Sequence, residues 1–168
     1  RVASLVLMDT APGPLSEGVS RAIFEKGAQI ARATSMQKLH EILRARAGDD
    51  KFRTEADRRL EREWGAERYW ARQQMRFTSM DVEAFERLGS ELAEQQPVTA
   101  RLDEIRCPTL VLVGETDAPF IAPSRAMHAA IADSRLALIP GGGHSPQIET
   151  PGPWIDAISA HLLRARGG

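Results

Sequence analysis

The sequence is poor in the features on which several classes of protein depend. Cys107 is its only cysteine, which excludes a disulfide within the chain and fits a reducing compartment. None of its uninterrupted apolar runs approaches the ~20 residues that a membrane-spanning helix needs. We therefore expect a cytoplasmic protein that has no membrane as a partner.

An excess of one charge and the common nucleotide-binding motifs are missing as well. The 22 Lys and Arg residues face 23 Asp and Glu residues, so the net charge of −1 gives no electrostatic reason to expect a nucleic-acid partner. No P-loop or G-x-G-x-x-G motif opens a helix after a strand, and no Cys/His cluster has zinc spacing. We expect no cofactor and no metal. What is present is an ordinary globular composition, 42% hydrophobic and 27% charged.

The two ends of the sequence predict strands of one parallel sheet. Residues 1–14 contain "VASLVLMD", a continuous apolar run typical of a strand buried on both faces, followed by the turn "APGP". Residues 97–168 contain a strand "CPTLVLVGETD", a helix "SRAMHAAIA", a strand "RLALIPGGGH" and a helix "PWIDAISAHLL". This alternation predicts an α/β fold. A buried parallel strand needs neighbours on both sides, so the first run suggests a piece of a longer protein.

Residues 15–96, between these ends, predict helices and no strand. Ser35 is a candidate N-cap for a helix with an apolar stripe, and "TEAD" at 54–57 fits a capping box that opens one long charged helix toward Met75. The arginines within 44–76 are mixed with Glu and Asp, which predicts a solvated helix face with i,i+4 pairs. This helical segment is then an insertion between strands.

The same segment is rich in large aromatic and sulfur-containing side chains. We expect them to form its core rather than a substrate pocket, although some could cover a ligand. His40 could also line a pocket. The large side chains are Trp64, Tyr69, Trp70, Met75, Phe77 and Met80.

Asp117 and His144 are the candidate catalytic residues. Asp117 follows the apolar run "TLVLVGET" and His144 follows "LALIPGGG", so each lies where a strand ends. The carboxyl ends of neighbouring parallel strands share one edge, and we expect the two side chains to meet there. A carboxylate bound to one imidazole nitrogen fixes the tautomer and leaves the other nitrogen as a base. The glycines at 141–143 would let the chain turn back tightly and place the ring over the edge.

Other interpretations of this edge stay open. Asp117 is also a residue type that simply ends a strand in a turn. Asp9, after the first strand, is a rival acid for His144. Glu149 is expected to accept backbone hydrogen bonds near the start of the last helix, and Ser145 to cap or turn the chain rather than react.

Three segments resemble one family. "IRCPTLVLVGETDAPF" and "IPGGGHSPQIETP" resemble the acid and histidine segments of α/β-hydrolases, and "VASLVLMDTAP" resembles the strand before that family's cap. The resemblance covers the two ends of the chain, and the helical middle only by position. It implies a partial α/β-hydrolase parallel sheet with a helical cap, residues 15–96, inserted after the first strand. It also implies that Asp117 is the acid and His144 the general base of a Ser-His-Asp triad.

One part of the family's site is absent from the sequence. The nucleophile elbow, G-x-S-x-G, occurs nowhere in the 168 residues. The resemblance then implies the C-terminal portion of a capped hydrolase for a small, mainly apolar ester or lactone, with the nucleophile in a missing N-terminal part. An epoxide hydrolase is disfavoured, because those enzymes use two cap tyrosines and this chain has only Tyr69. A carbon–carbon bond hydrolase and a cofactor-free haloperoxidase stay open. The rival from another class is a non-catalytic receptor that binds a small molecule in the same fold.

Overall fold

The computed structural model of the protein describes residues 2–14, 20–46 and 53–167. The chain divides into two compact units. The first draws on the ranges Arg1–Gly13, Thr54–Ala56 and Pro97–Gly168, and the second on Pro14–Arg53 and Asp57–Gln96. The sheet belongs to the first unit, and the helices between the first two strands make up most of the second.

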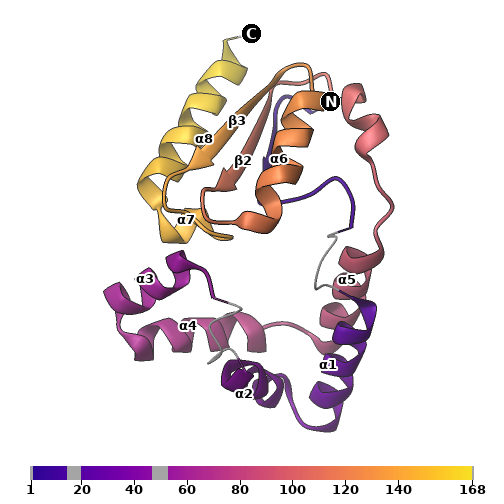
Figure 1. Ribbon diagram of the computed structural model, residues 1–168, viewed down its shortest axis with the longest axis vertical. Coiled ribbons are helices and arrows are strands. Elements are labelled where there is room, and N and C mark those ends of the chain that lie inside the picture. Colours follow the sequence, from indigo (N-terminus) through magenta and orange to yellow (C-terminus); the bar gives the residue numbers. More distant parts are fainter. Residues whose placement is uncertain (1, 15–19, 47–52, 168) are drawn as a thin grey trace. The chain divides into compact units, whose positions relative to one another are not determined.

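A three-stranded parallel sheet forms the middle of the first unit (Figure 1). Its strands, in spatial order, are β1 Leu5–Met8, β2 Thr109–Gly114 and β3 Ser134–Ile139. β2 pairs in parallel with both neighbours, so that Thr109 is aligned with Leu5 on one side and with Ser134 on the other. The predicted parallel α/β sheet is thereby confirmed, and the carboxyl ends of all three strands lie at one edge.

Helices cover both faces of this sheet (Figure 1). The helices of the first unit are η2 Thr99–Glu104, α6 Ala118–Ala130, α7 Pro146–Glu149 and α8 Pro151–Arg166. Val111 of β2 belongs to a core cluster with Met127 of α6, whereas its neighbour Leu112 belongs to a second cluster with Trp154 of α8. Successive side chains of a strand point to opposite faces, so one apolar run is enough to bind a helix on each side.

Two boundaries in the first unit differ from the prediction. β1 is short and half-buried, with Val6 37% exposed, because β2 is its only neighbour in the described part of the sheet. This apolar run, typical of a strand buried on both faces, therefore leaves part of its apolar surface exposed in the described residues. α6 begins at Ala118, well before the predicted start at Ser124, because Pro119 suits a first helical turn, where the backbone N–H has no intrahelical partner.

Five α-helices lie between β1 and η2 in the described sequence. They are α1 Arg21–Ala33, α2 Met36–Arg46, α3 Glu55–Trp64, α4 Ala66–Thr78 and α5 Val82–Glu94. The predicted cap of α2 is confirmed, because Ser35 Oγ accepts a hydrogen bond from the Lys38 amide at 3.0 Å. Asp81 caps α5 in the same way, by accepting hydrogen bonds from two amides of its first turn.

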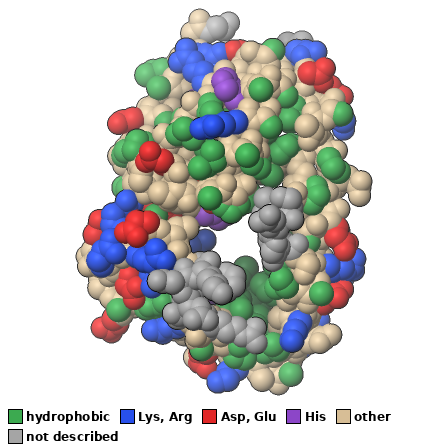
Figure 2. Space-filling model, in the orientation of Figure 1, with side chains coloured by type: hydrophobic (Ala, Val, Ile, Leu, Met, Phe, Trp, Pro, Cys, Tyr) green, Lys and Arg blue, Asp and Glu red, His purple; other side chains and the backbone are tan. Residues whose placement is uncertain are grey.

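The charged segment after Thr54 forms two helices instead of the single long helix predicted. Gly65 separates α3 from α4 with a φ of 81°, a left-handed value that glycine adopts without a Cβ penalty and that ends a helix. The capping-box signal still located the beginning of α3 at Glu55. Charged side chains of both signs gather over α3 and α4 (Figure 2), as the mixed sequence predicted.

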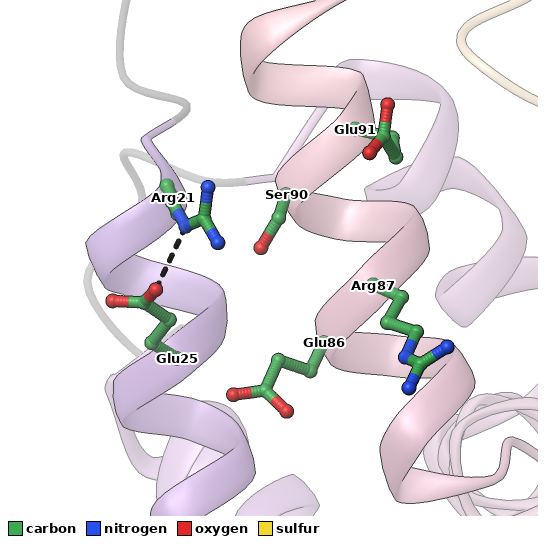
Figure 3. A pocket seen from close by; sticks show the side chains of 6 residues that line it. All are labelled: Arg21, Glu25, Glu86, Arg87, Ser90 and Glu91. Carbon is green, nitrogen blue, oxygen red and sulfur yellow. Dashed lines mark hydrogen bonds and ion pairs between the residues drawn. The ribbon is translucent and has the colours of Figure 1, made fainter.

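α1 and α5 pack closely against each other in the second unit. The rings of Phe24 and Phe85 meet edge to face at 5.6 Å, and each ring lies against a glycine of the opposite helix. A cavity of about 460 Å³ lies along this pair, lined by charged side chains and Ser90 (Figure 3). Arg21 in this cavity is already paired with Glu25 and Glu94, so its charge is compensated within the helix pair. No helix in the described ranges is both long and apolar enough to cross a membrane.

Candidate active site

Asp117 and His144 meet at the carboxyl edge of the sheet. Asp117 comes after the turn that follows β2, and His144 lies in the loop that follows β3. Asp117 Oδ2 and His144 Nδ1 are 2.9 Å apart, which confirms the predicted contact. Asp117 is only 3% exposed, whereas the side chain of His144 is 58% exposed. The pair therefore combines a buried acid with an imidazole that is open to a ligand.

The hydrogen bond to Asp117 sets the tautomer of His144. A carboxylate only accepts hydrogen bonds, so Nδ1 carries the hydrogen and the lone pair is on Nε2. This hydrogen bond, helped by the negative charge of Asp117, raises the pKa of His144 above its ordinary value, and burial opposes the rise. The ring is thus oriented with a basic nitrogen directed away from the acid.

The carboxylate of Asp117 binds His144 and not the first amides of α6, although Asp117 occupies the N-cap position of that helix. A residue that only ended the strand would use its side chain on the first amides of the helix. The side chain makes no such bond, and the turn is made by the main chain, with the Asp117 amide donating to the Gly114 carbonyl at 3.0 Å. The geometry therefore favours a role beside His144 over a simple turn.

Phe120 is a part of the site that sequence reasoning missed. Its ring stacks on the imidazole of His144, with 4.8 Å between centroids and 27° between planes. The Phe120 amide donates to the Asp117 carbonyl in the first turn of α6, so one helical turn supplies both contacts of the imidazole. The signal for it was an aromatic residue three positions after the acid, which becomes informative only once α6 is known to begin at Ala118.

The glycines before His144 serve the turn in two different ways. Gly141 has a φ of 65°, the left-handed value that makes the predicted tight turn. Gly143 is closely packed, because a Cβ there would lie 3.0 Å from Glu149 Oε2. The Gly143 amide donates to that same oxygen, and the Ser145 amide donates to Glu149 Oε1 at 3.3 Å. Glu149 thus accepts backbone hydrogen bonds as predicted, but from the loop that carries His144 rather than from the last helix.

The loop before His144 also packs directly on the turn after β2. A Cβ at Gly114 would lie 2.1 Å from the carbonyl oxygen of Gly143, so only glycine fits at the end of β2. The amide and the hydroxyl of Thr116 both donate to the Gly142 carbonyl, each at 2.8 Å. These contacts join the two loops and hold the acid and the imidazole in register.

Asp9 lies at the same edge, after β1, but it does not bind the imidazole. Its Oδ1 accepts a hydrogen bond from the Gly114 amide at 3.0 Å, and its Oδ2 is buried without a hydrogen-bond partner in the described part of the chain. The rival assignment of Asp9 as the partner of His144 is therefore wrong. Burial raises the pKa of Asp9 to about 6, the nearby charge of Asp117 adds to the rise, and the Gly114 amide opposes it.

The described residues contain no group of three or more His, Cys, Asp or Glu side chains arranged to hold a metal ion. What the edge offers instead is an imidazole with one oriented nitrogen, a buried carboxylate behind it and an aromatic ring on one face. Such an arrangement can take a proton from a hydroxyl or a water and return it to a leaving group.

The sequence matches a family model described as "Alpha/beta hydrolase family" over residues 1–157. The chain belongs to the α/β-hydrolase family. In α/β-hydrolases the chain order is nucleophile, acid, histidine, and Asp117 precedes His144 in agreement with that order. The resemblance first noted at the two ends of the chain therefore extends over nearly all of it.

Several known proteins are similar to this α/β-hydrolase chain. A Bacillus subtilis (strain 168) protein provisionally named 2-succinyl-6-hydroxy-2,4-cyclohexadiene-1-carboxylate synthase is 30% identical over 74 residues, which are 44% of this chain and 27% of that protein. A thermophilic esterase from Thermogutta terrifontis, solved with malate bound, is 26% identical with a TM-score of 0.75, over 98% of this chain and 57% of the esterase. The enol-lactonase from Burkholderia xenovorans LB400 is 23% identical with a TM-score of 0.71, over 97% of this chain and 57% of the lactonase, and shows the shared fold. The chain thus spans little more than half the length of these solved relatives.

Proposed function

We propose that this chain carries the acid and the general base of a Ser-His-Asp hydrolase that cleaves a small, mainly apolar ester or lactone. The observation that carries the proposal is the 2.9 Å contact between Asp117 and His144 at neighbouring strand ends. The esterase that shares 26% of its residues with the chain supports an ester-type substrate. Neither a cofactor nor a metal takes part in the proposed reaction, and the single cysteine fits a cytoplasmic setting.

The proposed roles follow from the geometry of the pair. A serine hydroxyl attacks the substrate carbonyl and gives its proton to His144 Nε2, while Asp117 stabilises the imidazolium that forms. His144 then returns the proton to the departing alkoxide, and water hydrolyses the acyl-enzyme by the same route in reverse. Phe120, stacked on the imidazole, restrains the ring while its protonation changes.

The serine is proposed to come from a part of the protein outside these residues. The elbow G-x-S-x-G is absent from the 168 residues, and the chain covers 57% of the related esterase. That N-terminal part of the same protein is then the partner on which activity depends. The same absence favours a second candidate, a non-catalytic receptor that binds a small molecule at this edge without turnover.

The test uses the longest chain that the gene encodes, assayed with short-chain p-nitrophenyl esters and a small lactone. The expected result is turnover, with His144→Ala lowering kcat by several orders of magnitude and changing KM little, because the base acts in the transition state. His128→Ala is the matched control: its ring contacts Ser134 at the beginning of β3, the opposite end of the strand, and its loss should leave kcat unchanged. Tight ligand binding without turnover, indifferent to His144→Ala, would establish the receptor instead.

A further inference from the structure

The imidazole of His144 has two neighbours that act on it in different ways. Asp117 Oδ2 lies 2.9 Å from Nδ1, and the ring of Phe120 lies against one face of the imidazole, with 4.8 Å between centroids and 27° between planes. The side chain of His144 is 58% exposed, so much of the ring remains open to a ligand. All three residues belong to the first unit.

The hydrogen bond to Asp117 leaves one motion of the imidazole unrestrained. A single hydrogen bond fixes the direction of the Nδ1–H group, but the ring can still turn about the line that joins Nδ1 to Oδ2. Such a turn moves Nε2 sideways, because Nε2 does not lie on that line. The nearly parallel ring of Phe120 opposes this turn, since a tilted imidazole would lose the stack. The two contacts therefore restrain different motions of one ring.

The ring of Phe120 also distinguishes the two protonation states of His144. The face of an aromatic ring is the negative side of its quadrupole. A cation within about 6 Å of the ring centroid is attracted to that face, and the imidazolium of His144 would lie within this range. The neutral imidazole stacks on the same face without the charge. Phe120 therefore favours the imidazole that has taken up a proton.

The first turn of α6 places Phe120 for this contact. The Phe120 amide donates to the Asp117 carbonyl at 2.9 Å, so one turn fixes both the acid and the aromatic ring. Phe120 is half-buried, and the hydrophobic clusters of the described residues do not include it. Its large apolar ring is thus used at the site rather than in the core of the unit.

We propose that Phe120 is a positioning residue for His144 whose aromatic face stabilises the imidazolium, giving the charged ring a second favourable neighbour besides Asp117. The proposal rests on the proposed function, in which His144 Nε2 takes the proton of the nucleophile. It adds to that function a residue that acts only through His144. For a ring as exposed as this one, a cation–π contact corresponds to about a twofold to fivefold change in rate.

The first test is an NMR titration of the full protein with two substitutions of Phe120. Phe120→Leu keeps most of the apolar cover of the imidazole but has no aromatic face, and Phe120→Tyr keeps the face. The carbon-bound ring protons of His144 should show the ring-current shift of a stacked aromatic ring, lose it in Phe120→Leu and keep it in Phe120→Tyr. The pKa of His144 should fall in Phe120→Leu alone. Unchanged signals of His128 and His161, in the same unit, report an intact fold.

Phe77→Leu is the matched control, because the ring of Phe77 lies 5.6 Å from that of His40 in the second unit. It should change the signals of His40 and leave the pKa of His144 in place. A ring-current shift that survives Phe120→Leu would show that the stack is absent and overturn the proposal. An unchanged pKa of His144 in Phe120→Leu, or an equal fall in Phe120→Tyr, would also overturn it, because the aromatic face would then have no effect of its own.

The second test measures rates in the protein that includes the nucleophile. Phe120→Leu should lower kcat by about twofold to fivefold with little change in KM. It should also move the acid limb of the pH profile of kcat/KM to lower pH, because that limb reports protonation of the free base. Phe120→Tyr should keep both properties.

The two tests separate this proposal from the hydrolase function. Unchanged kcat and an unchanged acid limb in Phe120→Leu overturn the role of Phe120 and leave the hydrolase function intact. Absence of turnover in the unaltered protein would count against the hydrolase function instead, and the NMR titration would still decide whether Phe120 stabilises the imidazolium of His144.

Discussion

The amide of Gly114 donates a hydrogen bond to Asp9 Oδ1 over 3.0 Å, and this contact ties the end of β1 to the turn that carries Asp117. The other carboxylate oxygen of Asp9 is buried and has no hydrogen-bond partner among the described residues. A buried carboxyl group with half of its acceptors unused is easier to keep neutral than charged. The raised pKa of Asp9, about 6, follows from this environment and has a consequence for stability.

Asp9 should make the protein less stable as the pH rises. Its pKa is about 6 in the folded protein and 3.8 in the unfolded reference, so the folded state binds the proton more tightly. The free energy of unfolding should therefore fall between about pH 4 and pH 6 and stay lower above that window, by at most about 3 kcal/mol for a shift of about 2 pH units. Asp9→Asn keeps an oxygen for the Gly114 amide and cannot ionise, so it should remove this decline. Urea unfolding from about pH 4 to pH 8 measures the effect.

The matched control for Asp9→Asn is Asp156→Asn, which removes one carboxylate from an exposed position of α8. The informative quantity is the difference between the profiles of the protein and the Asp9 variant, because other titrating groups cancel in it. Parallel profiles would show that Asp9 ionises normally in the folded protein, and its buried oxygen would then need another explanation.

The edge that carries Asp117 and His144 could be predicted because its signals are local and strong. Two apolar runs separated by one helix define neighbouring parallel strands, and the polar residues after them must then share an edge. That logic placed Asp117 beside His144 without knowledge of any contact. It favoured Asp117 but did not exclude Asp9 from the residues alone, because the hydrogen bond that occupies Asp9 comes from the main chain of Gly114, which no side-chain pattern reveals.

The parts that escaped prediction depend on single dihedral angles or on contacts between distant residues. The charge pattern and the capping box of "TEAD" predicted one helix through Gly65, but the left-handed φ of that glycine divides it. The arginines of this segment were expected to face solvent. Arg44 is exposed, as expected, but its guanidinium also lies over Trp70 of another helix, and local periodicity carries no information on such a pairing.

Asp117→Asn should lower both the pKa of His144 and the rate of the proposed reaction. The hydrogen bond that Asp117 accepts from His144 is the largest cause of the raised pKa, and an amide supplies neither the charge nor a pure acceptor. In the protein that includes the nucleophile, kcat should fall by roughly 10⁴-fold, because the imidazole can adopt the wrong tautomer. Histidine NMR titration gives the pKa and the ester assay gives kcat.

Asp9→Asn is the comparison for this prediction. The charge of Asp9 raises the pKa of His144 less than Asp117 does, so its removal should lower the pKa of His144 by less. A larger fall in that variant would reverse the roles of the two acids.

Gly114→Ala should destabilise the loop that carries His144. A Cβ at Gly114 would lie 2.1 Å from the Gly143 carbonyl oxygen, and backbone must move to relieve the overlap. The expected loss in the free energy of unfolding is about 1–3 kcal/mol, with loss of the contact between Asp117 and His144. Gly152→Ala is the control, because a Cβ there meets nothing within 4 Å in the first turn of α8, and it should be neutral or stabilising by up to about 1 kcal/mol. Equal effects of the two changes in urea unfolding would mean that the two loops are not packed as described.

The last prediction concerns the 168 residues assayed by themselves. They should not hydrolyse p-nitrophenyl esters above a background comparable to that of free imidazole. The oriented imidazole supplies a base, but the elbow that would supply an attacking serine is absent from the sequence. Removal of a nucleophile costs several orders of magnitude in rate, and even one missing oxyanion donor costs ~10²–10³.

Robust esterase activity of the isolated chain would contradict this expectation and would point to a nucleophile among its own serines. Ser145 is the first to test, because it adjoins His144 and its hydroxyl makes no capping bond at the beginning of α7. Ser145→Ala would then abolish the activity, whereas Ser134→Ala, at the far end of β3, would serve as the control and leave it intact. Activity that survives Ser145→Ala but not His144→Ala would mean that another serine or the imidazole itself attacks the ester.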